Sequence, residues 1–227
     1  MPDYESFREA GFYKSPDLKE DRIFLSDFFE DPDKNPLGTP SGKIEIFSET
    51  IDSFNYEDCP GHPTWMEPTE WLGAKEKAYP LHLISNQPKT KLHSQMDNGT
   101  LSSSIKIKGH QPLEMNPDDA KSRGITQGDI VRVFNGRGSC LCGVNITTDV
   151  MPGVVIISTG SWYDPAEPND PKSMCKHGNP NVLSPDIGTS KLGQGPAAHS
   201  CLAEIEIYDG PTQDITAFNP PEIIEKK

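Results

Sequence analysis

Hydrophobic residues recur at the spacing of β-strands mainly in the second two thirds of the chain. Short apolar runs occur in "YPLHLIS" (79–85), "GDIVRVFNGRGSCLCGVNIT" (128–147), "PGVVIIS" (152–158) and "HSCLAEIEIYD" (199–209). Turn-forming residues bound these runs, which is typical of strands separated by tight turns. In the 128–147 stretch the turn "NGRG" separates two alternating segments. The pattern therefore predicts a β-hairpin there and single strands in the other three runs.

Two short helices are predicted from their end signals. "NPDDAKSRGI" (116–125) opens with Asn116 as N-cap and Pro117 at the first helical position. Asp118 and Asp119 occupy its first turn, and Gly124 stands where a left-handed residue ends a helix. A second short helix is expected near "YESFREAGF" (4–12).

The first 78 residues show no sustained helical or strand period and are predicted to form an extended arm. One exception is "GKIEIFSETIDSF" (42–54), in which Ile44 and Ile46 alternate with charged residues, so we expect an edge strand. The proline-rich "CPGHPTWMEPTEW" (59–71) is expected to be an irregular loop. Its two tryptophans, Trp65 and Trp71, are expected to pack against other residues.

The sum of these elements predicts a mainly β fold with short helices. About six strands with regular turns indicate a small mixed β-barrel. We expect an arm and inter-domain segment at 1–78, the barrel at 79–210 and a C-terminal tail at 211–227.

Composition narrows the classes of function. The chain has 227 residues, 22 Pro, 19 Gly, a mean hydropathy of −0.60 and a formal charge of −13. Such a charge argues against a broad nucleic-acid or anionic-membrane surface, because either needs a cationic face. The sequence contains no apolar run long enough to span a membrane and no secretory signal. The compartment, periplasmic or cytoplasmic, stays open.

No catalytic or metal-binding motif is predicted. The five cysteines include no CxxC pair, so neither a disulfide framework nor a zinc site is indicated, and all five are expected to be small buried residues. Cys140 and Cys142 alternate, which places them on one face of a strand. The histidines lack metal-ligand spacing, and the chain has neither a GxSxG elbow nor a Walker A loop.

Three polar segments follow predicted strands. Residues 85–100, here the first loop, carry amides, hydroxyls, Lys89 and Lys91. These donors suit a phosphate-bearing or purine-like ligand, although a solvated loop has the same composition. Residues 158–165, the second loop, contain Trp162 and Tyr163, which either wall a pocket or cap the barrel. Residues 176–195, the third loop, combine polar side chains with glycines and prolines, which indicates an ordered, functional loop.

These segments, in this order, resemble a known family. The runs "PLHLISNQPKTKLHSQMDN", "MNPDDAKSRGITQGDIVRVFNGRGSCLCGVNITTDVMPGVV", "GSWYDP" and "HGNPNVLSPDIGTSKLGQG" are similar to the C-terminal domain of the dimethyl sulfoxide reductase family. The last run is most similar to the trimethylamine N-oxide, dimethyl sulfoxide and biotin sulfoxide reductase branch. With the upstream "LGTPSGKIEIFSE", the resemblance covers nearly the whole chain.

The resemblance implies a six-stranded double-psi β-barrel that closes over a bis(molybdopterin guanine dinucleotide) cofactor with molybdenum or tungsten. The family's contacts then fall on Ser85, Asn86, Lys91, His93, Ser94, Gln95, Asn181, Asp186 and Gln194. The first loop departs from the family's common "SxHP", because it reads "SNQP".

The resemblance also implies that the chain is not catalytic alone. The metal ligand of the family lies in an earlier domain, so the expected partners are the catalytic domains or subunit of the same molybdoenzyme. The expected reaction is the reduction of S-oxides or N-oxides. Two alternatives are a non-reductase relative such as a transhydroxylase, and a cofactor-free interaction module.

Overall fold

The computed structural model describes residues 1–16, 21–221 and 223–224 and divides into two compact units. The first unit comprises Met1–Asn55 and Pro60–Pro63, and the second comprises Tyr56–Cys59 and the chain from Thr64 onward. Each unit is described by itself below.

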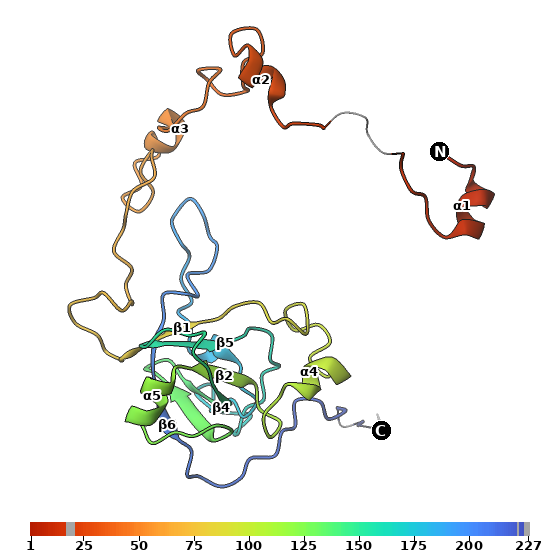
Figure 1. Cartoon of the computed structure of the whole chain (residues 1–227). Coiled ribbons are helices and arrows are strands. Elements are labelled where there is room, and N and C mark those ends of the chain that lie inside the picture. The colour runs from red at the N-terminus through yellow and green to blue at the C-terminus, as the bar shows by residue number, and fades with distance from the viewer. Residues whose placement is uncertain (17–20, 222, 225–227) are drawn as a thin grey trace. The chain divides into compact units, whose positions relative to one another are not determined.

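The second unit is built on a closed barrel of six strands. The strands are β1 (Leu81–Ile84), β2 (Pro112–Met115), β3 (Ile130–Phe134), β4 (Ser139–Ile146), β5 (Val154–Ile157) and β6 (Leu202–Ile207). Their order around the barrel is β1-β5-β2-β4-β3-β6, with β1–β5 and β2–β4 parallel and the other pairs antiparallel. Figure 1 shows these strands gathered in one part of the chain. The predicted double-psi β-barrel is confirmed.

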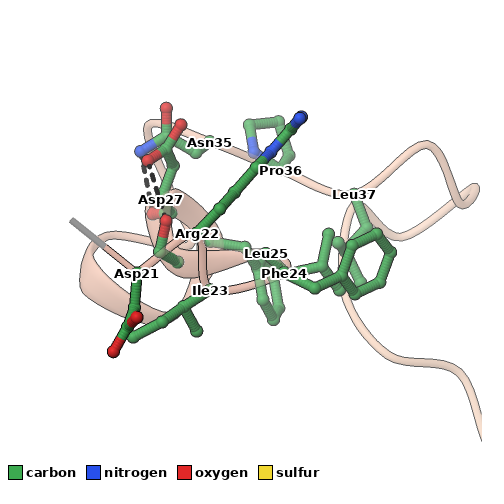
Figure 2. Close-up of a pocket in the computed structure, with 11 residues that line it drawn as sticks. Asp21, Arg22, Ile23, Phe24, Leu25, Asp27, Asn35, Pro36 and Leu37 are labelled. Atoms are coloured by element: carbon green, nitrogen blue, oxygen red, sulfur yellow. Dashed lines mark hydrogen bonds between the residues drawn. The ribbon is translucent and has the colours of Figure 1, made fainter. Parts of the chain in front are cut away.

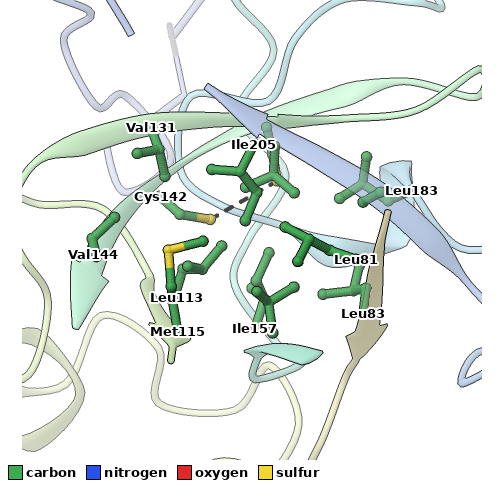
Figure 3. Close-up of a cluster of buried hydrophobic side chains, with 14 of the residues drawn as sticks. Leu81, Leu83, Leu113, Met115, Val131, Cys142, Val144, Ile157, Leu183 and Ile205 are labelled. Carbon is green, nitrogen blue, oxygen red and sulfur yellow. Dashed lines mark hydrogen bonds between the residues drawn. The ribbon is translucent and has the colours of Figure 1, made fainter. Parts of the chain in front are cut away.

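Alternating side chains fill the barrel interior. In β3, Val131 and Val133 are fully buried whereas their neighbours are only partly buried. Figure 3 shows Val131, Cys142 and Leu113 pointing into the same interior from three different strands. Cys140, Cys142, Cys175 and Cys201 are buried as predicted, whereas Cys59 is half-buried. Burial of this apolar set drives barrel closure, because each such side chain contributes about 1.5–3 kcal/mol.

One predicted strand is wrong and one strand was not predicted. Ile44 and Ile46 are 68% and 81% exposed, and residues 42–54 form no strand. A segment of alternating residues forms a strand only when its backbone can hydrogen-bond to a neighbouring strand, and no strand lies in the described part of the first unit. β2 was missed because it is four residues long and begins with Pro112, which lacks the N–H that a ladder uses.

The two predicted helices are confirmed. α5 (Pro117–Ser122) has Asn116 as N-cap, whose side chain accepts a hydrogen bond from the Asp118 N–H at 2.9 Å. Gly124 follows in the left-handed region at φ 66°. α1 (Tyr4–Ala10) begins after Asp3 and ends at Gly11. The barrel unit also contains α4 (Thr100–Ser104) and the 3-10 turn η1 (Pro180–Val182).

The first unit holds short helices and exposed apolar side chains. α2 (Ser26–Glu30) and α3 (Glu49–Asp52) are joined by irregular chain. An open pocket of about 990 Å³ lies beside α2, where Asn35 donates to the Asp27 carbonyl at 2.9 Å (Figure 2). Phe24 and Phe29 are 83% and 70% exposed. Such exposed aromatic residues are typical of a surface that packs against further protein.

A bidentate ion pair anchors the segment before β1 to the barrel. Glu70 accepts hydrogen bonds from Arg137 at 2.5 and 3.0 Å and from the Leu202 N–H at 2.8 Å. Arg137 holds the pKa of Glu70 below its ordinary value. Trp71 is half-buried and meets Trp65 edge-on at 5.7 Å, while Trp65 itself stays 70% exposed.

None of the helices in the described ranges is long and apolar enough to cross a membrane.

Candidate functional site

The first and second loops leave the same edge of the barrel. β1 and β5 are parallel neighbours, with Ile84 opposite Ile156. Because the first loop follows β1 and the second follows β5, parallel pairing places both loops side by side. Their juxtaposition is a direct consequence of strand topology.

Hydrogen bonds join these two loops. Ser158 Oγ donates to Asn86 Oδ1 at 2.7 Å, and the Thr159 N–H donates to the Asn86 carbonyl at 2.9 Å. Further along, Trp162 Nε1 donates to the Ser94 carbonyl at 2.8 Å. The two loops therefore form one ordered surface in which Asn86 and Ser94 are held in place.

Gly160 allows the closest approach between the loops. Its φ is +92°, and a Cβ built there would lie 1.8 Å from the His93 carbonyl oxygen. Only glycine fits such a gap and such a dihedral angle. The second loop can therefore lie directly against the backbone of His93 and Ser94.

A buried charged cluster lies beneath the first loop. Asp97 is fully buried and accepts hydrogen bonds from Lys91 Nζ, from Lys106 Nζ at 2.9 Å and from the Trp162 N–H at 3.0 Å. Burial by itself would raise the pKa of Asp97, but the hydrogen bonds from Lys91, Lys106 and Trp162 outweigh it and lower that pKa. Two ammonium groups share one carboxylate here, so the cluster carries surplus positive charge directly below the polar loop.

Gln111, Ser161 and His177 complete this cluster, which we call the Asp97 cluster: Lys91, Asp97, Lys106, Gln111, Ser161 and His177. Ser161 Oγ donates to Gln111 Oε1 at 2.7 Å. His177 is fully buried, its Nδ1 lies 3.1 Å from the Trp162 carbonyl, and its Nε2 has no hydrogen-bond partner in the described part of the chain. Burial, assisted by the positive charge of Lys106, lowers the pKa of His177 to about 4, so its ring is neutral at pH 7.

The structure places most predicted first-loop residues at the surface. Asn86, His93, Ser94 and Gln95 are exposed, and Ser85 is half-buried. The ring of His93 contacts Gln87, with its Nδ1 3.0 Å from Gln87 Nε2.

Lys91 differs from these residues, because its side chain is 1% exposed and paired with Asp97. Its ammonium group therefore holds the loop through the buried ion pair with Asp97.

The third loop divides into a buried beginning and an exposed end. At its start, the His177 carbonyl accepts from the Gln111 N–H and the Lys176 N–H donates to the Asp164 carbonyl. Asn181, Asp186 and Gln194 are exposed. Gln194 Nε2 donates to the Ser190 carbonyl at 2.7 Å, which closes a narrow turn.

Residues 187–197 form a narrow projection from the barrel (Figure 1), with the Thr189 N–H bonded to the Gly195 carbonyl. No hydrogen bond among the described residues connects Asn181, Asp186 or Gln194 to the first loop. The structure therefore brings together the first-loop residues and the second loop, and leaves these three apart.

A cavity of about 530 Å³ adjoins the first loop. Asn86, Gln87 and Lys89 form one wall, and Ile105, Ile107 and Ile156 supply apolar surface. Glu114, Gln127 and Asn145 contribute polar groups from the barrel. A cavity with apolar walls and a few placed polar groups is typical of ligand sites.

In the second loop, Trp162 contacts both the first loop and Phe218. Trp162 is 39% exposed, and its ring meets Phe218 edge-on at 5.2 Å. Its indole N–H and backbone N–H both bind first-loop groups, so it fixes the wall of the site.

Several residues of the site carried no signal in the sequence. Asp97 lies in the first loop but was not among its predicted contacts, and Lys106 and Gln111 lie outside the quoted runs. Only the fold brings these three residues together. A buried acid in "MDN" could have been suspected from the lysines around it. Among the described residues, no group of three or more His, Cys, Asp and Glu side chains could hold a metal ion.

The barrel and its loops define the class to which this chain belongs. Residues 81–202 match the family described as the molydopterin dinucleotide binding domain. The chain belongs to this family, as the C-terminal domain of dimethyl sulfoxide reductase family proteins.

Its relatives narrow the branch. The chain is 46% identical over 224 residues to a dimethyl sulfoxide/trimethylamine N-oxide reductase of Cereibacter sphaeroides, covering 98% of this chain and 27% of that protein. It is 47% identical to the trimethylamine-N-oxide reductase of Salmonella typhimurium, covering 97% and 26%. It is 46% identical to a biotin sulfoxide reductase of Cereibacter sphaeroides, covering 94% and 28%. The chain thus spans about a quarter of the length of these relatives.

Among solved structures, acetylene hydratase from Pelobacter acetylenicus is similar, with a TM-score of 0.62 and 20% identity over 78% of this chain and 25% of that chain. This similarity concerns the fold alone.

Proposed function

We propose that this chain is the cofactor-closing domain of a molybdenum or tungsten oxidoreductase that reduces S-oxides or N-oxides. The observation that carries the proposal is the ordered polar surface formed by the first and second loops, in a chain of the dinucleotide-binding family. The bound group would be bis(molybdopterin guanine dinucleotide).

The residues present fit such a group. Amides and hydroxyls read the hydrogen-bonding edges of pterin and guanine, and cations meet phosphate oxygens. In the first loop, Ser85, Asn86, His93, Ser94 and Gln95 would supply hydrogen bonds. Lys91 would act from below, because the Asp97 cluster holds surplus positive charge under an anionic ligand.

The third loop would also bind the cofactor, through Asn181, Asp186 and Gln194. Asn181 follows the Asn179 cap of η1, so its backbone is fixed while its side chain is exposed. Gln194 closes the turn of the projection. The cavity beside Asn86 and Lys89 would accept a flat polar ring between its isoleucine walls.

When bound, the metal–dithiolene group supplies oxygen-atom transfer, with the balance XO + 2H⁺ + 2e⁻ → X + H₂O. The residues of this chain would bind and orient the cofactor and keep water from it. The remaining three quarters of such a protein would supply the metal ligand and the substrate pocket.

Catalytic domains or a catalytic subunit are therefore the proposed partners. Residues 1–78 would form the inter-domain segment, 79–210 the cofactor-binding barrel and 211–227 its tail. Support for this arrangement comes from the exposed aromatic side chains of the first unit, such as Phe24 and Phe29.

A chimeric enzyme tests the assignment. This chain would replace the corresponding quarter of the Cereibacter sphaeroides dimethyl sulfoxide/trimethylamine N-oxide reductase. Asn86→Ala and Gln95→Ala are expected to lower pterin fluorescence retained after gel filtration. Each variant would lose a hydrogen bond that the bound cofactor buries, at a cost of roughly 1–3 kcal/mol. Asn169→Ala, a change at an exposed amide outside the three loops, serves as the matched control.

Reductase activity with dimethyl sulfoxide and trimethylamine N-oxide is measured on the same samples. The proposal expects both activities to fall in step with cofactor content. Equal cofactor content in the loop variants and in the Asn169→Ala control would contradict the assigned contacts. Full cofactor retention without any S-oxide or N-oxide reduction would instead contradict the reductase activity.

A further inference from the structure

The C-terminal segment 212–218, here the strap, is held firmly against the barrel. Asp164 accepts hydrogen bonds from the Thr216 N–H at 2.7 Å, Thr216 Oγ1 at 2.6 Å and the Ala217 N–H at 3.1 Å. Lys176 Nζ also donates to Thr216 Oγ1 at 2.9 Å. Burial would raise the pKa of Asp164, but the hydrogen bonds from Thr216 and the charge of Lys176 outweigh it and lower that pKa. The strap is therefore tied to an ionised, buried carboxylate.

Phe218, at the end of the strap, covers the Asp97 cluster. Its ring centroid lies 5.2 Å from that of Trp162 and 5.0 Å from that of His177, edge-on in both cases. Lys106 Nζ lies 5.8 Å from the same ring. One aromatic side chain thus contacts a neutral histidine, a cation and the tryptophan that binds the first loop.

We propose that Phe218 and its anchor Asp164 are positioning residues that hold Trp162, and through it the first loop, in the arrangement that receives the cofactor. Phe218 packs on Trp162, Trp162 Nε1 binds the Ser94 carbonyl, and the Trp162 N–H binds Asp97. The effect of these two residues on cofactor binding rests on the proposed function, whereas their contacts with the barrel and the first loop do not.

Removal of the ring has a defined physical effect. The Asp97 cluster would lose its apolar cover, and water would reach the unpartnered Nε2 of His177. The charged groups around His177 are Lys106, Asp97 and Asp164. With water present, the protonated ring is better solvated, so its pKa moves up toward the ordinary value. Trp162 would also lose the aromatic contact that fixes its ring.

The first experiment uses the 227-residue chain and reports on geometry without any cofactor. His177 is followed by NMR through a pH titration, with His177→Gln for assignment, in wild type, Phe218→Ala, Phe218→Leu and Asp164→Asn. We expect a higher His177 pKa and faster exchange of the Trp162 indole N–H in Phe218→Ala and Asp164→Asn. Phe218→Leu should restore most of the wild-type behaviour, because an apolar cover remains. Phe29→Ala, an exposed aromatic of the first unit, is the matched control and should change neither signal.

The second experiment places the same variants in the chimeric reductase and measures pterin retained after gel filtration. Phe218→Ala is expected to lose cofactor several-fold faster than wild type, with Phe218→Leu close to wild type. If the wild-type chimera itself fails to retain pterin, the proposed function is wrong. The NMR result then still tests whether Phe218 and Asp164 hold Trp162 in place. If wild type and Phe218→Ala retain pterin equally, the positioning role is overturned while the proposed function stands. Unchanged His177 and Trp162 signals in a folded Phe218→Ala chain would also overturn it.

Discussion

Asp97 receives hydrogen bonds from three separate segments of the chain: Lys91 in the first loop, Lys106 after α4 and Trp162 in the second loop. No other described acid in the barrel unit is paired with two buried lysines. A single residue therefore couples the polar surface of the site to the stability of the barrel.

Replacement of Asp97 by Asn should be strongly destabilising. It would leave Lys91 and Lys106 buried without a counter-charge, and breaking a buried pair in this way costs about 3–5 kcal/mol. Urea unfolding at pH 7 measures the loss. Asp149→Asn, an exposed control, should change the free energy of unfolding by less than about 0.5 kcal/mol. Matching unfolding curves for the two variants would rule out the role assigned to Asp97.

His177 should make stability depend on pH in a defined window. Its pKa is lowered from 6.5 to about 4 in the folded chain. Between these values the unfolded chain binds a proton that the folded chain does not, so stability falls as the pH drops from 6.5 toward 4. Wild type should lose roughly 2 kcal/mol more than His177→Gln between pH 7 and pH 4.5, measured by urea unfolding. An identical pH dependence in both proteins would contradict a neutral buried ring.

At the scale of elements, the contact between the second and first loops depends on Gly160. Gly160→Ala should destabilise far more than Gly128→Ala. Both glycines have positive φ, at 92° and 82°, but a Cβ at residue 160 would meet the His93 carbonyl whereas one at residue 128 meets nothing within 4 Å. Backbone strain alone should cost about 1 kcal/mol at Gly128, and the added clash should bring Gly160 to about 3 kcal/mol or more. Thermal unfolding of the two variants measures the difference, and equal costs would show that the loops do not approach as described.

The segment before β1 depends on the Glu70–Arg137 pair. Glu70→Ala removes both Arg137 contacts and the bond to the Leu202 N–H. We expect residues 64–73 to become sensitive to limited proteolysis while the barrel stays intact, because the pair anchors this segment at one point. Glu76→Ala, an exposed acid of the same segment, should leave the cleavage pattern unchanged. Protection of Glu70→Ala equal to that of wild type would exclude the anchor.

At the scale of the whole molecule, the barrel was largely readable from the sequence and the site only in part. β3 could be predicted because its buried Val131 and Val133 alternate with half-buried residues, and β4 because a tight turn precedes it. β2 was not predicted, and Ile44 and Ile46 gave a false strand, because apolar and charged residues also alternate in exposed chain that has no neighbouring strand. The donors of the first loop were predicted by residue type, and their contacts with a cofactor stay a prediction. The Asp97 cluster and the strap were not, since their members are far apart in sequence and meet only through barrel closure.

We propose that this chain closes a molybdopterin dinucleotide site. Pterin content per polypeptide after gel filtration tests it most directly, in the chimeric reductase and in the same reductase with its own C-terminal quarter removed. We expect the pterin content of the chimera to be near that of the intact relative and that of the truncated protein to be several-fold lower. Equal pterin content in the chimera and the truncated protein would contradict it.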